Sequence, residues 1–303
     1  MPSGIYTNRT NVDLPADIAQ EIMQKAVGAS AIMKLATRHP LPGRGSEIGV
    51  ITGDPEAAWV DETAQKPVSN PTLSSKLLKG YKLAVIVPFS NQFRRDLPAL
   101  YDALIARLPG ALGNKFDKTV IGAVAKPGAD FDNFAACTAQ ELVPSGTDTV
   151  YGNLVKGYAD IATHGGSLTG FAVSPAGNSL LLGSVDSVGR PIFTAGAAEG
   201  EIARILNAPV YEGRGLYKAG SAAGDSSAAQ AAIVGVMGDW SQAVYGVVED
   251  VDISFSDQAT LTINDSQVNL WERNMFAVRA EMEVGFRAMT DVFNILLGAT
   301  PSA

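Results

Sequence analysis

The sequence predicts an α+β protein, and three patterns within its 303 residues carry that prediction. A helical pattern occupies residues 93–125, a strictly alternating pattern occupies 276–288, and short segments of both kinds follow one another over 151–240. Apolar residues recur every three or four positions in a helix and every second position in a strand, so the period separates the two classes. A chain of this length can build one large core or two domains of ordinary size.

Composition narrows the class of protein. Hydrophobic residues make up 46% and charged residues 18%, which is typical of an ordered chain. The net charge of −8 argues against tight binding to nucleic-acid phosphates. The single cysteine, Cys137, excludes an intrachain disulfide, indicates an intracellular folding environment and is predicted to be a small buried residue. No segment is typical of a signal peptide or a membrane span.

The chain is predicted to begin with an arm and a helix. Residues 1–14 are polar and have no period, which indicates an extended N-terminal arm. A helix is expected from Pro15, with Ile18, Ile22 and Val27 on its apolar stripe. The proline- and glycine-rich stretch at 38–45 ends this first segment.

Residues 46–89 predict a projecting arm of two strands, at 46–52 and 79–90. The second strand has large apolar residues at every second position from Tyr81 to Phe89, whereas the intervening stretch is polar and rich in proline. An irregular connection this long is unusual inside a compact domain, so an arm with an irregular tip is the simpler interpretation. Such an arm has no core of its own, yet it carries Trp59, a residue that is usually buried. Trp59 is therefore expected to bury itself against another molecule.

Residues 93–125 predict a long helix with one apolar stripe. Some thirty residues at 1.5 Å each would span about 45 Å. Pro98 fits a first turn, whereas Pro109, with Gly110 and Gly113 behind it, predicts a kink or a break.

The remaining segments predict an α/β domain followed by long strands. Helices are expected at 151–166 and 176–184, and strands at 169–175, 203–213 and 231–240. Residues 249–257 and 276–288 alternate, and the latter would form a strand longer than about 40 Å. The charged positions of the last strand predict either a solvated face or a subunit contact; they are Arg279, Glu281, Glu283 and Arg287.

Signals for an enzyme are absent from the sequence. His39 and His164 lie in loop-like contexts and stand in no metal-binding spacing. There is no nucleophile-elbow motif, and "GRGSEIG" at 43–49 lacks the ending of a phosphate-binding loop. The carboxylate pairs at 130–132 and 250–252 are interpreted as solvated faces. We therefore predict a protein that is not an enzyme, with no catalytic residue, no cofactor and no metal site.

Several stretches resemble the major capsid proteins of tailed bacteriophages, the phage capsid family, whose fold is the Hong Kong 97 fold. "AAWVDETAQKPVSNPTLSSKLLKGYKLAVIVPFS" at 57–90 resembles the extended loop of that family, and "LPALYDALIARLPGALGNKFDKTVIGA" at 97–123 resembles its spine helix. "LNAPVY" at 206–211 is similar to a turn of its axial domain. The segments at 238–257 and 269–289 are similar to its closing strands. The resemblance begins near residue 12 and keeps the order of the family.

The resemblance implies an α+β Hong Kong 97-type fold with an N-terminal arm, an extended β-hairpin loop, a peripheral domain and an α/β axial domain. The implied segments are 1–45 (N-terminal arm and first helix), 46–89 (extended loop), 90–150 (peripheral domain with the spine helix), 151–245 (axial domain) and 246–303 (long strands returning to the peripheral domain).

The resemblance also implies a structural function. Copies of the chain would form pentamers and hexamers that close an icosahedral shell around double-stranded DNA, packaged without sequence-specific binding. The protein would be made in the bacterial host cytoplasm and reside in the virion, with no membrane partner. Separate scaffolding and portal proteins, and in some phages decoration proteins, would be its other partners. The expected inter-subunit contacts are Trp59, Asp61, Glu62, Lys66, Arg279, Glu281, Glu283 and Arg287.

Two other interpretations stay open at this point. An encapsulin-like shell subunit would have the same fold but enclose a cargo enzyme, and such shells tend to begin with a helix rather than a free arm. A cytoplasmic α/β enzyme or binding protein would need a convergent polar site, which the sequence does not reveal.

Overall fold

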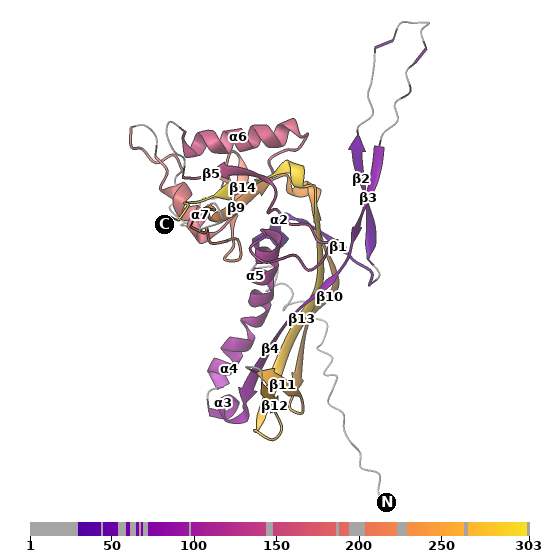
Figure 1. The fold of residues 1–303 in the computed structure, drawn as a ribbon, viewed down its shortest axis with the longest axis vertical. Helices are drawn as coiled ribbons and strands as arrows, with labels where there is room; N and C mark the ends of the chain where they lie inside the picture. The colour runs from indigo at the N-terminus through magenta and orange to yellow at the C-terminus, as the bar shows by residue number, and fades with distance from the viewer. Residues whose placement is uncertain are drawn as a thin grey trace, which may run out of the picture.

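The computed structural model describes residues 30–43, 45–53, 59–60, 65–66, 68, 72–96, 98–143, 148–185, 188–193, 204–222, 229–263 and 266–301. It contains a long four-stranded sheet lined by three helices, a six-stranded sheet with its own helices, and a two-stranded arm (Figure 1). The predicted N-terminal arm and most of the first helix lie outside the described residues. The end of that predicted helix is α2 (Ala31–Leu35).

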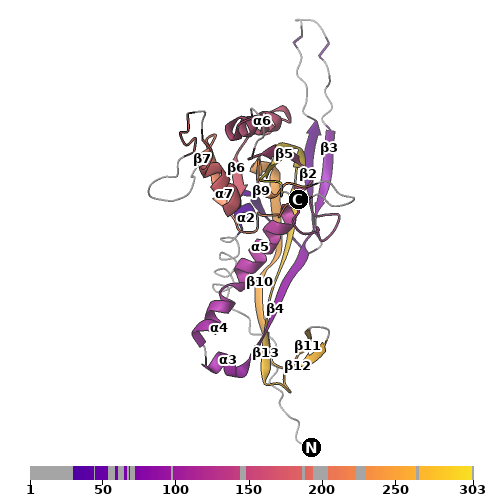
Figure 2. The same cartoon turned by 60° about the vertical axis from the view of Figure 1, so that its left-hand side comes forward.

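The long sheet has the order β1-β10-β13-β4 and runs the length of the elongated part of the molecule (Figures 1 and 2). Its strands are β1 (Thr37–Pro40), β10 (Ala243–Ser256), β13 (Met275–Ala288) and β4 (Tyr81–Ser90). A small hairpin of β11 (Thr260–Ile263) and β12 (Ser266–Asn269) joins β10 to β13. The prediction of a strand at 276–288 is confirmed, and every second residue from Phe276 to Ala288 is buried.

Three helices lie along the long sheet where the sequence predicts one long helix. They are α3 (Asn91–Asp96), α4 (Pro98–Ile105) and α5 (Leu108–Val120). The predicted break is confirmed: α4 ends at Ile105, and Pro109 stands in the first turn of α5. A proline there cannot bond to the carbonyl four residues earlier, and its ring would clash with that group. The predicted apolar stripe faces the core at Leu108, Leu112, Phe116 and Val120.

The arm is a hairpin of β2 (Ser46–Gly53) and β3 (Thr72–Leu78), and this corrects the predicted strand pairing. The alternating segment expected to be its second strand is β4, which pairs instead with β13 in the long sheet. The physical reason is that the alternating apolar residues of β4 need a buried face, which a projecting hairpin cannot supply. β3 was not predicted as a strand, because "TLSSKLL" lacks a period-two apolar pattern.

The second sheet has the order β5-β14-β9-β6-β8-β7. Its strands are β5 (Thr138–Glu141), β14 (Phe293–Leu297), β9 (Ile233–Gly238), β6 (Gly170–Val173), β8 (Ala208–Glu212) and β7 (Arg204–Ile205). Helix α6 (Val150–Thr163) contacts β5, β14 and β9, and α7 (Pro175–Leu182) contacts β6 and β9. The single-turn helices η1 (Trp240–Gln242) and η2 (Thr290–Val292) lead into β10 and β14.

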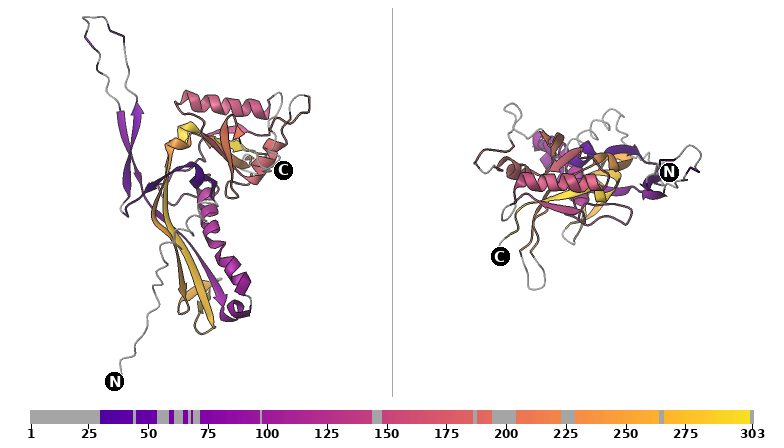
Figure 3. Two further views of the ribbon diagram at one scale, coloured as in Figure 1. Left: turned by 180° about the vertical axis from the view of Figure 1, so that it is seen from behind. Right: turned by 90° about the horizontal axis from the view of Figure 1, so that it is seen from above.

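The expected elements at 151–166, 169–175, 176–184 and 231–240 are confirmed as α6, β6, α7 and β9. The predicted strand at 203–213 is divided into the hairpin β7–β8 by a turn in which Leu206 and Asn207 have positive φ. Two strands of the sheet come from outside the range 151–245: β5 precedes it, and β14 lies near the end of the chain. The segment after β13 therefore contributes β14 to the second sheet, as the back view in Figure 3 also shows.

Aromatic residues make the core continuous between the two sheets. Phe134 packs against Phe286 of β13 at a ring-centroid distance of 5.6 Å and against Phe293 of β14 at 4.6 Å. Trp240 packs edge to face on both Phe134 and Phe293. Its indole N–H donates to the carbonyl of Gly170, so this large side chain is buried without an unsatisfied donor.

A buried carboxylate joins α5 to the start of α2. Asp117 accepts a hydrogen bond from the Ser30 hydroxyl at 2.5 Å and one from the Ala31 N–H at 3.1 Å. Ser30 is the N-cap residue of α2, so Asp117 fixes the cap from a distant helix. Burial raises the pKa of Asp117 from 3.8 to about 7, and the hydrogen bonds oppose part of that rise.

Replacing Asp117 by asparagine is expected to change how stability depends on pH. Because the folded-state pKa is raised, the stabilising contribution is complete below about pH 4 and is lost as the pH rises through about 7. A pKa that is about three units higher in the folded state corresponds to about 4 kcal/mol in the free energy of unfolding. As the pH rises from about 4 to about 7, wild type should therefore lose stability while Asp117→Asn does not. The difference in the free energy of unfolding between the variant and wild type should shift in favour of the variant by up to about 4 kcal/mol.

Urea unfolding of unassembled subunits at a series of pH values measures this difference, with the exposed Asp148→Asn as a control. Parallel pH profiles for wild type and Asp117→Asn would contradict the role of burial.

Candidate subunit-contact site

The tip of the arm carries exposed apolar side chains. Trp59 is fully exposed in the single chain, and Val68 is 86% exposed. Lys66 is also exposed, whereas Asp61 and Glu62 lie outside the described residues. Large apolar groups that remain in water on a projecting element mark an interaction surface. The expectation that Trp59 finds no core within its own chain agrees with this exposure.

The base of the arm rests on two glycines of the long sheet. Gly246 of β10 and Gly285 of β13 lie directly opposite each other. The buried side chain of Leu78, the last residue of β3, fills the space above them. A Cβ atom on Gly285 would meet the backbone carbonyl of Lys79. The missing side chains therefore let the chain pass from the arm into β4 close against the sheet.

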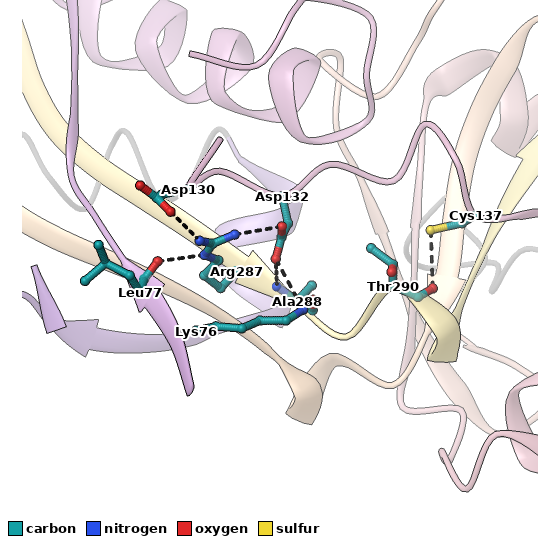
Figure 4. Close-up of polar contacts among 8 residues, drawn as sticks. All are labelled: Lys76, Leu77, Asp130, Asp132, Cys137, Arg287, Ala288 and Thr290. Atoms are coloured by element: carbon teal, nitrogen blue, oxygen red, sulfur yellow. Dashed lines mark hydrogen bonds and ion pairs between the residues drawn. The ribbon is translucent and has the colours of Figure 1, made fainter. Parts of the chain in front are cut away.

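A cluster of charges fastens the base of the arm to the end of β13 (Figure 4). The two terminal nitrogens of Arg287 lie 2.9 Å from carboxylate oxygens of Asp130 and Asp132. The Arg287 Nε–H donates to the backbone carbonyl of Leu77 in the arm at 2.8 Å. Only 13% of the Arg287 side chain is exposed, so these charge-assisted bonds are shielded from water. We call these four residues the arm clamp.

Lys76 adds a second connection between the arm and the long sheet. Its ammonium donates to the carbonyl of Ala288 at 3.0 Å and lies 3.7 Å from a carboxylate oxygen of Asp132 (Figure 4). Asp132 also accepts the N–H of Ala288 at 3.2 Å. Together with the arm clamp, these contacts determine the direction in which β2 and β3 leave the sheet.

Sequence reasoning did not find the arm clamp. The pair at 130–132 was interpreted as a solvated face, but Asp130 and Asp132 bind Arg287 while Phe131 between them is buried. The alternation of acid, aromatic and acid was the available signal, since it places the two carboxylates on one side. The prediction that the carboxylate pair at 250–252 lies on a solvated face agrees better with the structure. Asp250 is exposed and pairs with Arg38 at 3.1 Å.

The other predicted contact residues share the outer face of β13. Arg279 donates to the Ser254 hydroxyl at 3.1 Å and lies 3.5 Å from a carboxylate oxygen of Glu281. Glu281 and Glu283 are half-buried and lie opposite Asp252 and Glu249 of β10. Arg287 differs from these three because its guanidinium is committed to the arm clamp. The structure thus separates a charged outer face from a structural arginine.

Residues that could carry chemistry have other roles. His39 lies on β1, not in a loop as expected, and His164 caps the end of α6, where its Nδ1 is 2.9 Å from the Asp160 carbonyl. Burial raises the pKa of the Cys137 thiol to about 12, so the thiolate is suppressed, and the thiol donates to the Thr290 carbonyl (Figure 4). Among the described residues, no three potential metal ligands gather, and no helix is long and apolar enough to cross a membrane.

Comparisons with known proteins give a consistent result. The probable major capsid protein gp17 of Mycobacterium phage L5 is 29% identical over 287 residues, which cover 90% of this chain and 85% of that protein. A solved structure from Mycobacterium phage Ogopogo has a TM-score of 0.73 at 17% identity, covering 89% of this chain and 92% of the other. The capsid of a native GTA particle computed with C5 symmetry has a TM-score of 0.55 at 17% identity, covering 99% and 95%.

At these identities the two solved structures establish a common fold and no more. The match to a family model reaches further, since the model described as the phage capsid family covers residues 11–291, which is most of the sequence. The chain therefore belongs to the phage capsid family.

Proposed function

We propose that this protein is the major capsid protein of a tailed phage, whose copies assemble into a closed shell. The observation that carries the proposal is the arm, which projects from the long sheet and exposes Trp59 completely. An element without a core of its own is stable when a neighbouring copy covers it. Membership of the phage capsid family supports a structural, non-enzymatic role in the virion.

The fold that best fits this role is the Hong Kong 97 type. In that interpretation, the arm of β2 and β3 is the extended loop, and the long sheet with α3, α4 and α5 is the peripheral domain. The six-stranded sheet with α6 and α7 is the axial domain, to which β14 also belongs. Residues 1–45 would supply the N-terminal arm and the first helix, and they include the edge strand β1.

The proposed partners are mainly further copies of the chain, arranged as hexamers and pentamers in an icosahedral shell. The net charge of −8 suits a wall that encloses double-stranded DNA without gripping it. Separate scaffolding and portal proteins, with decoration proteins in some phages, would complete the head, and synthesis would take place in the host cytoplasm. Salt-sensitive, tight binding of the isolated subunit to DNA would contradict the charge argument.

The proposed contacts between copies comprise the arm tip and the outer face of the long sheet. Trp59 would be the apolar anchor, with Asp61, Glu62 and Lys66 as charges around it. Arg279, Glu281 and Glu283 would meet a neighbour across the outer face of β13. Arg287 would act indirectly, because the arm clamp sets the direction of the arm.

An encapsulin-like shell is the second candidate, since it would have a related fold. The comparisons do not favour it, because the family match and the named relative are phage capsid proteins.

The expressed protein is expected to form particles of millions of daltons rather than monomers or dimers. Size-exclusion chromatography with light scattering measures the mass, and electron microscopy of the same fraction shows whether closed shells are present. A stable monomer or dimer under all assembly conditions would overturn the proposed function. Small cages loaded with an enzyme would instead support the encapsulin-like alternative.

A further inference from the structure

We propose that a hollow between α5 and the edge strand β4 receives Trp59 of a neighbouring copy. This inference rests on the proposed function, because it needs a second copy of the chain. It specifies which surface of the neighbour accepts the arm, which the fold alone does not tell.

The hollow is lined mainly by apolar side chains. With the loop counted separately, these apolar residues come from four segments: Tyr81 and Leu83 of β4, Phe116 of α5, Val124 and Phe131 of the following loop, and Val284 of β13. Phe116, Phe131 and Val284 are buried and form its floor. After α5 ends at Val120, the chain turns at Gly122, which has a φ of +79°, and the loop that follows forms one wall of the hollow. β4 is the last strand of its sheet, so no described strand covers this side.

The size and lining of the hollow suit an aromatic ring. Its volume is about 150 Å³, and an apolar cavity of roughly that volume can bind benzene. One edge of an indole can therefore enter while the rest remains at the open mouth. The rings of Tyr81 and Phe131 already meet edge to face at 6.2 Å, as do those of Phe116 and Phe131. A third ring inserted here can adopt the same favourable geometry.

The charges at the rim complement the sequence around Trp59. Lys82 and Lys115 line the hollow and are exposed. Neither lysine forms an ion pair with another residue in the described part of the chain. Asp61 and Glu62 follow Trp59 by two and three positions. An apolar anchor beside two acids thus matches an apolar hollow beside two lysines, and such complementarity selects one partner surface over others.

The donor of Trp59 must be another copy. Both views in Figures 1 and 2 show that β2 and β3 carry the chain away from α5 and β4. The arm clamp fastens the base of the arm in this direction. Trp59, which follows β2, is therefore delivered to a neighbour and not to the hollow of its own subunit.

A second hollow, beside α6, provides the comparison. It is lined by Val155, Tyr158, Ser167, Leu168, Leu206 and Asn207, and its volume of about 380 Å³ is larger. Among the described residues that line it, none is basic, and three of the six carry an amide or a hydroxyl group. It lacks the positive rim that an acidic arm tip requires, so the hollow beside α5 is the better match.

Disulfide trapping in assembled shells tests the proposal directly. In a Cys137→Ser background, Val60→Cys next to the anchor is combined with Ala125→Cys on the rim of the α5 hollow. Oxidation should convert most chains into cross-linked species on a non-reducing gel, and peptide mass spectrometry should identify the 60–125 bond. The matched control combines Val60→Cys with Val155→Cys at the other hollow, and it should stay uncrosslinked. If shells form and only the control pair cross-links, the proposal is overturned.

Charge reversal gives a second, independent readout. Lys115→Glu should lower the assembled fraction by about tenfold or more, because it sets like charges side by side. Glu62→Lys in the same chain should restore assembly. Lys118→Glu, also exposed on α5 but outside the hollow, should assemble normally. Equal losses from Lys115→Glu and Lys118→Glu, or no rescue, would refute the proposal. Failure of the wild-type chain to form shells would instead refute the proposed function beneath it.

Discussion

Trp59→Ala should leave the subunit folded and abolish most shell assembly. The side chain is fully exposed in the single chain, so its removal costs the isolated subunit no core contact. Aromatic anchors at interfaces often contribute about 2 kcal/mol or more each. A shell repeats each contact in every subunit, and a loss of that size at every copy shifts the balance from shells to free subunits.

The measurement compares urea unfolding of the free subunit with the yield of particles by light scattering and electron microscopy. Trp271→Ala is the matched control, because Trp271 is 70% exposed but lies in the turn before β13, far along the chain from the arm. Its unfolding and its particle yield should both stay near wild type. Normal particles from Trp59→Ala would show that the arm tip is not an anchor, and equal losses from both variants would show that the effect is not specific to the arm.

Arg287→Ala should destabilise the subunit itself. Removing the guanidinium takes away the cation that binds both Asp130 and Asp132, and it leaves the Leu77 carbonyl without this donor. Breaking a largely buried ion pair from one side typically costs about 3 kcal/mol or more. Asp130 is 38% exposed and can regain water, which places the expected loss at the lower end of that range, about 3 kcal/mol.

Urea unfolding of unassembled subunits measures this loss, and Arg279→Ala is its control on the same strand. Arg279 is 47% exposed and bonds only at the surface, so its replacement should cost less than about 1 kcal/mol. Arg287→Lys should fall between the two, because an ammonium cannot hold both carboxylates and the Leu77 carbonyl in one plane. Equal unfolding free energies for Arg287→Ala and Arg279→Ala would contradict the arm clamp.

Much of the fold was predictable because single elements bury one face. The alternation at 276–288 and the stripe from Leu108 to Val120 are direct imprints of burial, and both predictions are confirmed. The helix break at Pro109 was also predictable, because a proline cannot continue the hydrogen bonding of the preceding turn. The pairing of the arm was wrong because periodicity reports that a strand has a buried face and not which strand lies beside it.

The site was predictable only where a residue contradicts its local context. Trp59 stands out because Asp61, Glu62 and Lys66 follow it closely, and its exposure agrees with that interpretation. The arm clamp could not be predicted in the same way. Arg287 meets its acidic partners across 155 and 157 positions of the chain, and no local pattern encodes a contact of that range. The role of Arg287 was therefore predicted only as one of four charges on a strand face.

The position of β14 has a consequence for the order of events during synthesis. This strand lies between β5 and β9 in the six-stranded sheet, yet it is the last strand that the structure describes, at Phe293–Leu297. Until the ribosome has released these residues, the facing edges of β5 and β9 have no strand between them, and unpaired edges invite incorrect pairing. Completion of the second sheet thus waits for the synthesis of β14, so a chain made only as far as β13 cannot enter a growing shell with a finished second sheet.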